Sequence, residues 1–122
     1  MSALSWVLAA PAGALGALAR FGTGRLMARG LGLHAPWGVL AVNILGTFLL
    51  GVLVGINPGH GLVLILGAGF LGSYTTFSTW MAETDALAEE RRWNAALLNL
   101  VVPAAGGLVV GAAGFALGLA LA

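Results

Sequence analysis

The chain has 122 residues, of which 60% are hydrophobic and only 7% are charged, with a net charge of +1. A soluble domain carries roughly 25% charged residues, so this composition excludes a soluble globular protein and indicates one that lies in a lipid bilayer. The lack of cysteine excludes disulfides and thiolate metal sites, and five arginines without a lysine form no basic patch dense enough for nucleic acid.

Four apolar segments follow one another along the chain, and each is near the roughly 20 residues that a helix needs to cross a bilayer. They run from about Leu4 to Leu26, Trp37 to Ile56, Leu62 to Met81 and Trp93 to Leu121. The N-terminal residues are expected to begin the first helix rather than a signal peptide, because they lack a basic leading region. The sequence therefore predicts an all-α, multi-pass protein of the cell membrane with a single domain, residues 1–122.

The connections between these segments are short. The first, Ala28–Pro36, contains His34, and the second, the turn sequence Asn57–Gly61, contains His60. The two histidines are therefore expected on opposite sides of the membrane, where they cannot form one site. The third connection, Ala82–Arg92, holds all four acidic residues and is predicted to be a solvated helix end or connector. No catalytic set stands out, so we do not expect an enzyme.

The first segment carries small residues on one stripe, at Gly13, Gly16 and Ala17, which permit close helix packing in lipid. Arg20 falls near the end of this span. Two interpretations of Arg20 are about equally favoured. Its side chain either reaches the membrane interface, with the stem in lipid, or makes a structural contact with another helix.

The second segment places Asn43 and Thr47 four residues apart, so they share one face of a helix, and Gly51 and Gly55 continue a nearby stripe. Taken alone, Asn43 would be expected to make an interhelical hydrogen bond, worth about 1 kcal/mol in a membrane. The alternative is an amide that faces an anion, and the third segment leads us to favour it.

The third segment is interrupted by polar and small residues between Gly69 and Trp80, with two glycines, one tyrosine and five Ser or Thr hydroxyls. Glycine loosens a helix, and backbone carbonyls freed at membrane depth are tolerated only where protein, water or an ion satisfies them. A hydrophobic segment with such an interruption points to an ion site near the midplane of the bilayer. We therefore expect this helix to be broken.

The polar side chains of the spans are neutral hydrogen-bonding groups, without the acids or histidines that cation or proton transport usually needs. Phe77 and Trp80 lie three apart on the third segment, with Ser78 and Thr79 between them. Two aromatic residues at this spacing are most often packing residues. Hydroxyls and the positive edges of aromatic rings, however, suit a small anion, and the neighbouring interruption favours that interpretation here.

The fourth segment contains two GxxxG pairs, Gly107 with Gly111 and Gly114 with Gly118, and is predicted to pack closely against another helix. Pro103 is expected to break or bend its regular hydrogen bonding. Asn99, one turn earlier, is the only interior polar side chain of this segment.

These segments together resemble the Fluc-type, or CrcB-like, fluoride channels, which are small proteins of four membrane helices. The resemblance covers essentially the whole chain. It is carried by Gly13–Phe21 in the first segment, Pro36–Phe48 in the second and, most specifically, Gly69–Trp80 in the third.

The resemblance implies an antiparallel dimer with two fluoride pores, a third helix broken mid-membrane, and a Na⁺ ion at the dimer centre bound by backbone carbonyls of Gly72 and Thr75. It implies passive export of fluoride for fluoride resistance, without catalysis. The residues that match its pore are Asn43, Phe77, Ser78, Thr79 and, with a substitution, Trp80. Arg20 and Gly46 are expected to be structural.

The chain departs from the family pattern in three places. Where the family usually has Gly-Gly-Phe, this chain has Gly72-Ser-Tyr74; Trp80 stands where a second Phe is usual; and Asn99, Pro103 and Gly107 lie where the fourth helix often has hydroxyls. These departures keep open a second interpretation, a non-conducting or partly conducting partner subunit. A small four-helix multidrug-type exporter is a third, but it usually carries a glutamate within the membrane, and Glu83 is expected at a helix end.

The arginines are distributed unevenly. Arg25, Arg29, Arg91 and Arg92 fall at or in the first and third connections, and Arg20 lies toward the same end. The N-terminus, the turn Asn57–Gly61 and the C-terminus contain no Lys or Arg. By the positive-inside rule the chain should insert in one orientation with both termini outside. We therefore expect one half of a heterodimer with a homologous chain of opposite orientation, with a homodimer as the alternative.

Overall fold

The computed structural model describes residues 2–32 and 37–122, and every regular element within them is a helix. Four helices or helical stretches are long and apolar enough to cross a membrane. The elements are α1 (Ala3–Gly30), α2 (Trp37–Ile56), α3 (His60–Leu62), η1 (Val63–Leu71), α4 (Gly72–Tyr74), α5 (Phe77–Glu89) and α6 (Trp93–Leu121). The predicted all-α architecture with four spans is confirmed. His34 and Pro36, in the first predicted connection, lie outside the described residues.

The second and fourth spans begin and end at the predicted residues, whereas the other two are longer than expected. The third span continues as α5 to Glu89, so most of the acidic segment is helical and the connection to α6 is only Glu90–Arg92. Of the two predictions for Ala82–Arg92, a helix end or a connector, the helix end is the one observed up to Glu89. Alanine, leucine and glutamate, which fill this segment, are all good helix formers.

The third span is broken in its middle, as predicted. Helix α4 ends at Tyr74 and α5 begins at Phe77. Between them the backbone is extended, with φ −79° and ψ 161° at Thr75 and φ −146° and ψ 120° at Thr76. The widened π-helical turns of η1 come just before this break, and such turns occur frequently at functional sites.

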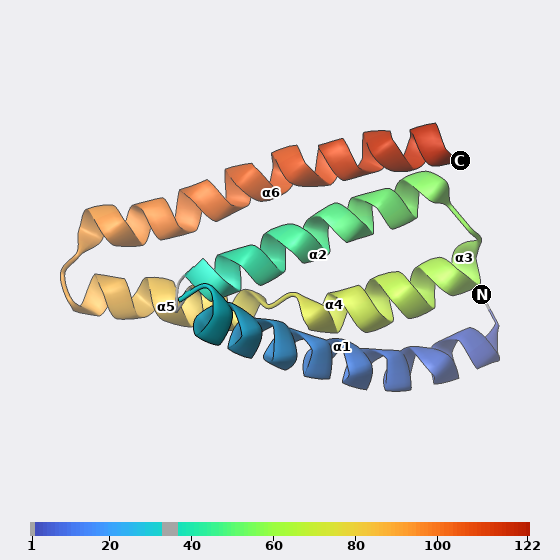
Figure 1. Ribbon diagram of the computed structural model, residues 1–122, viewed down its shortest axis with the longest axis horizontal. Helices are drawn as coiled ribbons and strands as arrows, with labels where there is room; N and C mark the ends of the chain where they lie inside the picture. The colour runs from blue at the N-terminus through green and yellow to red at the C-terminus, as the bar shows by residue number, and fades with distance from the viewer. Residues whose placement is uncertain (1, 33–36) are drawn as a thin grey trace.

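The helices pack as two pairs that lie side by side: α2 runs along α6, and α1 runs along η1 and α4 (Figure 1). Glycines permit the close approach in both pairs. A Cβ atom on Gly114 or Gly118 would collide with the backbone carbonyls of Phe48 or Val52 in α2, and one on Gly16 would collide with the carbonyl of Phe70. The predicted packing role of these glycines is thus visible in the contacts.

Helix α6 continues through Pro103 without a break, contrary to one of the two outcomes expected for this proline. The proline ring still lacks an N–H group, so one helical hydrogen bond is missing at this point.

Large apolar side chains remain exposed along all four spans, including Leu26 at 70% and Leu108 at 78% exposure. In water such a surface would be unfavourable, but in a bilayer the acyl chains cover it at no cost. The helices therefore present apolar faces suited to lipid or to another helical subunit.

Candidate functional site

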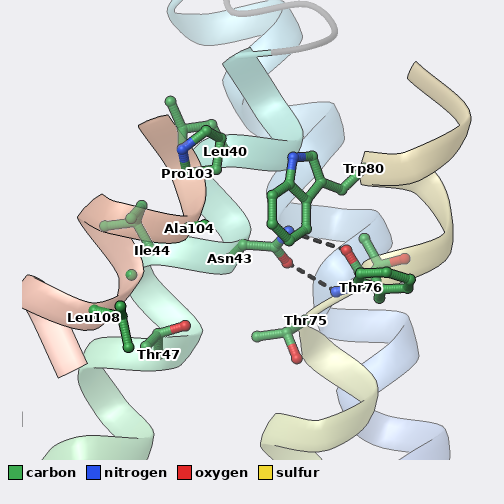
Figure 2. A pocket seen from close by; sticks show the side chains of 12 residues that line it. Leu40, Asn43, Ile44, Thr47, Thr75, Thr76, Trp80, Pro103, Ala104 and Leu108 are labelled. Atoms are coloured by element: carbon green, nitrogen blue, oxygen red, sulfur yellow. Dashed lines mark hydrogen bonds between the residues drawn. The ribbon is translucent and has the colours of Figure 1, made fainter. Parts of the chain in front are cut away.

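The broken segment of the third span is held by the side chain of Asn43 from α2. The Asn43 amide nitrogen donates to the Thr76 carbonyl at 3.0 Å, and the Thr76 N–H donates to the Asn43 side-chain oxygen at 2.8 Å (Figure 2). This two-point contact satisfies both backbone groups of a residue that lies outside any helix. The interhelical hydrogen bond considered for Asn43 is therefore present, and it is made to the backbone of the break.

Thr76 also begins the helix that follows. Its hydroxyl accepts from the Thr79 N–H at 3.3 Å and thereby caps the N-terminus of α5. The same hydroxyl donates to the Thr79 hydroxyl at 3.2 Å and lies 3.4 Å from that of Ser78. Thr76 was not among the predicted site residues. Its preference for the N-cap position is the one sequence signal that could have identified it.

Arg20 from α1 reaches the break rather than the membrane interface. Its guanidinium donates to the Thr75 carbonyl at 3.3 Å. Of the two interpretations left open for Arg20, the structural contact is the one observed. Arg20 lies in the second half of α1, on the side of Arg25 and Arg29, and its side chain binds the break from there.

The break removes the helical partners of the backbone carbonyls of residues 72–75, and Gly72 and Thr75 are two of them. In a continuous helix the Gly72 carbonyl would accept from the Thr76 N–H, and the Thr75 carbonyl would accept from the Thr79 N–H. Both N–H groups instead bind side chains, as described above. Gly72 and Thr75 therefore present carbonyl oxygens that are free of the helical ladder, although Thr75 also receives Arg20.

Gly46 lies directly against the break. A Cβ atom there would overlap the Thr75 methyl group and would lie 3.2 Å from the Tyr74 ring. Tyr74 is buried at 5% exposure, and its hydroxyl donates to Thr23 of α1 at 3.1 Å. Phenylalanine, which the family usually has at this position, has no hydroxyl and could not make this hydrogen bond. Any side chain at Gly46 would displace the break.

A cavity of about 340 Å³ lies beside the break, between α2, α5 and α6. Three predicted pore residues, Asn43, Phe77 and Trp80, meet at its wall. Thr47, which was predicted to share a face with Asn43, also lines it, and so do Pro103 and Gly107 of α6 (Figure 2). The wall is completed by Leu40, Ile44, Ala104 and Leu108, which are apolar, and by the two residues of the break, Thr75 and Thr76.

The two aromatic side chains in this cavity stand edge to face. Their ring centroids are 5.8 Å apart and their planes are inclined by 88°. Phe77 is 69% exposed, whereas Trp80 is half-buried and its indole N–H donates to the Asn99 carbonyl of α6. The indole donor that distinguishes Trp80 from phenylalanine is therefore already occupied.

The structure does not bring Ser78 and Thr79 to the same cavity. Ser78 is exposed. Thr79 lines a second cavity of about 370 Å³, together with Arg20, Arg25 and Thr76. Thr76 contributes to both cavities, so the break separates an aromatic-lined space from a space that contains two arginines.

Glu83 is the acidic residue that the sequence led us to place at a helix end. It lies instead within α5, one turn beyond Trp80, and its carboxylate oxygens are both buried. Among the described residues neither oxygen has a hydrogen-bond partner. Glu83 lines a small hollow with Asn43, Trp80 and Asn99, so an acid does lie within the third span.

The chemistry of this region is that of a polar path through an apolar bundle. It offers hydroxyls, side-chain amides, aromatic edges and two arginines as donors, and one carboxylate, that of Glu83, while the described residues contain no group of three or more His, Cys, Asp or Glu that could hold a metal. The donors are suited to an anion, because each presents hydrogen or the positive part of its charge distribution.

Comparisons with known proteins agree with this picture. A family described as CrcB-like protein, Camphor Resistance (CrcB), matches residues 7–115. The fluoride-specific ion channel FluC 2 of Mycobacterium tuberculosis is 45% identical over 103 residues, which cover 84% of this chain and 82% of that protein.

Two further relatives match over more of the chain. The fluoride-specific ion channel FluC 1 of Symbiobacterium thermophilum is 42% identical over 94% of this chain and 98% of its own length. The protein of the same name from Leifsonia xyli is 41% identical over 100% of this chain and 93% of its own length. Similarity of this extent covers every helix described above.

Proposed function

The chain belongs to the CrcB-like family, and from this membership we propose that it is a subunit of a fluoride-selective channel that exports fluoride passively across the cell membrane. The chain is a multi-pass membrane protein, and its family is one of channels rather than enzymes. The observation that carries the proposal furthest is the broken third span, whose extended residues are fixed by Asn43 beside an aromatic-lined cavity.

The exposed groups suit the chemistry of fluoride. A small anion that loses its hydration needs hydrogen-bond donors or positive ring edges to replace water. Phe77 and Trp80 supply ring edges, and Asn43 has a second amide N–H that is not committed to Thr76. In the proposed pathway these three residues contact the ion, and the hydroxyls of Ser78 and Thr79 continue its polar path beyond the break.

We assign a structural Na⁺ ion to the carbonyls of Gly72 and Thr75. These oxygens are hard, neutral ligands. Because the Thr76 N–H donates to Asn43, it does not donate to the Gly72 carbonyl as it would in a continuous helix. Gly72 is exposed in the single chain, where a second subunit can bring an equivalent pair of carbonyls. The ion would neutralise the aligned carbonyl dipoles at the centre of an antiparallel dimer.

The orientation of the subunit follows from its charges. We propose that both termini lie outside, because the arginine-rich connection between α5 and α6 would remain on the cytoplasmic side. A chain whose arginines lie at one end inserts in one orientation, so an antiparallel dimer needs a partner that inserts in the opposite orientation. A homologous chain of opposite bias is therefore the proposed second subunit, and the homodimer is the alternative.

A second candidate function is a subunit that conducts poorly unless a homologous partner completes the pore. This function is favoured by Trp80, which lines the cavity between α2, α5 and α6. Its indole is bulkier than the phenylalanine that is usual in the family at this position. Both candidates predict a membrane protein with the same fold, so transport must distinguish them.

Fluoride efflux from liposomes tests the proposal. Purified protein, alone or co-expressed with a homologue, is reconstituted into vesicles loaded with potassium fluoride, and efflux is followed with a fluoride electrode after valinomycin is added. We expect fluoride efflux and no chloride efflux from a matched preparation. Efflux only with the homologue would support the second candidate, and no fluoride efflux in either sample would contradict both.

A further inference from the structure

Pro103 leaves one carbonyl of α6 without its helical partner. In an α-helix each carbonyl accepts from the N–H four residues later, and the residue four positions after Asn99 is Pro103, which has no N–H. Asn99 is half-buried where α6 packs against α5. A carbonyl in this position must find another donor or remain at a free-energy cost.

Trp80 of α5 provides that donor. Its indole N–H donates to the Asn99 carbonyl. The Asn99 side-chain amide in turn donates to the Thr84 hydroxyl at 2.9 Å, and that hydroxyl donates to the Trp80 carbonyl at 2.9 Å. Trp80, Thr84 and Asn99 thus form a closed ring of hydrogen bonds, which we call the α5–α6 brace.

We propose that Trp80 and Pro103 act as a pair, in which Trp80 satisfies the carbonyl that Pro103 leaves free and is thereby held with its six-membered ring toward the cavity. This inference deepens the proposed fluoride pathway and rests on it for its functional meaning. In Figure 2 the indole nitrogen of Trp80 lies away from Asn43, while the six-membered ring faces Asn43. Both residues line the cavity, as does Pro103.

The pairing determines what Trp80 offers to an anion. Its N–H group is used in the α5–α6 brace, so the cavity receives only ring edges, as it would from phenylalanine. Pro103 is then a positioning residue, because it acts through the orientation of the indole. Phenylalanine at position 80 would leave the Asn99 carbonyl unsatisfied in this chain, even though phenylalanine is usual in the family.

A double-mutant cycle tests the pair. The full-length channel carries Trp80→Phe, Pro103→Ala or both, and melting temperature and fluoride efflux are measured for each. We expect Trp80→Phe alone to lower the melting temperature by about 2–4 °C and to reduce efflux, as for the loss of one buried hydrogen bond. In the Pro103→Ala background the backbone N–H that the substitution restores can serve Asn99, so adding Trp80→Phe should change little.

The matched control is Trp93→Phe. Trp93 begins α6, is 65% exposed and does not line the cavity, so its replacement should have the same effect with and without Pro103→Ala. A spectroscopic readout separates orientation from bulk stability. The ¹⁵N–¹H signal of the Trp80 indole should shift toward that of a free indole in Pro103→Ala, whereas the Trp93 signal should not move.

If Trp80→Phe has the same effect in both backgrounds, or if the Trp80 indole signal is unchanged by Pro103→Ala, the pairing is wrong. Should Trp80→Phe alone fail to fold, recovery of folded protein in the double variant supports the pairing, and failure of both variants overturns it. A native channel without fluoride efflux would contradict the proposed function but would leave the melting and spectroscopic cycle to decide the pairing.

Discussion

Asn43 combines two tasks that a single amide can perform at once. Its oxygen and one N–H are bound to the backbone of Thr76, and the second N–H is left for another acceptor. Asn43 therefore has enough hydrogen-bonding groups to bind the break and still offer one N–H to the cavity. The position therefore links the conformation of the third span to the wall of the cavity.

Asn43→Asp tests the amide donors of this residue, both the one that binds the Thr76 carbonyl and the one left for another acceptor. The aspartate keeps an acceptor for the Thr76 N–H but loses both amide donors and places a negative charge beside the cavity. We expect fluoride efflux to fall at least about tenfold, which corresponds to about 1.4 kcal/mol in the barrier. Initial efflux rates from liposomes measure this effect.

Asn94→Asp is the control for that change. Asn94 is exposed near the start of α6 and lines none of the cavities described above, so the same chemical change should leave efflux unaltered. Normal efflux from the Asn43→Asp channel would remove Asn43 from the proposed pathway.

The sequence predicted Asn43, Phe77 and Trp80 as pore residues. The structure brings these three to one cavity, and their role in a pore stays a prediction. The same prediction grouped Ser78 and Thr79 with them, but residues 77–80 all lie in α5, where about 100° of rotation per residue places 78 and 79 on another face than 77 and 80. A motif match gives the residues of a site but not the helix face that each one takes.

The glycines of α2 and α6 determine how close these helices can come. A Cβ atom on Gly51 would overlap the carbonyl of Gly111, and one on Gly55 would overlap that of Phe115. The contacts are reciprocal, since Gly114 and Gly118 meet α2 carbonyls in the same way. Other parts of the same two helices line the cavity, so these contacts position two of its walls.

Gly114→Ala should therefore destabilise the protein despite the higher helix propensity of alanine. The new methyl group would force α6 away from the Phe48 carbonyl, and overpacking of this kind typically costs about 1–3 kcal/mol. The measurement is thermal unfolding in detergent, followed by circular dichroism.

Gly22→Ala provides the same chemical change in open space. Nothing lies within 4 Å of a Cβ atom on Gly22, which is an exposed position of α1. We expect this variant to be unchanged or slightly more stable, by up to about 1 kcal/mol. Equal melting temperatures for the two variants would show that the α2–α6 spacing tolerates a methyl group.

At the level of elements, hydropathy predicted the spans but not their internal variation. Helix α2 begins and ends where the apolar segment does, because Pro36 precedes it and Asn57-Pro-Gly follows it, and α6 begins where Arg91 and Arg92 end the charged segment. The π-helical turns of η1 have no distinct sequence pattern, since glycines and aliphatic residues also fit an α-helix. The break itself was predictable from its glycines and hydroxyls, but its two-residue extent was not.

The arginines are distributed unevenly along the long axis of the molecule. Figure 1 shows both termini and the connection between α2 and α3 at one end, and the connection between α5 and α6 at the other. Arg91 and Arg92 lie in that second connection, and Arg25 and Arg29 occupy the last turns of α1, away from its N-terminus. The charge separation that the sequence indicated is therefore also a separation in space, apart from Arg20 at the break.

The last prediction is that the chain inserts in one orientation. Because the native chain has no cysteine, single cysteines at Ser2 and at Glu90 report the two ends without further changes. In intact cells a membrane-impermeant maleimide should label Ser2→Cys and should label Glu90→Cys only after lysis, since basic connections remain in the cytoplasm. Replacing Arg91 and Arg92 by alanine should weaken this preference. Equal labelling of both positions in intact cells would mean that the chain inserts both ways, and the homodimer would then replace the heterodimer as the proposed assembly.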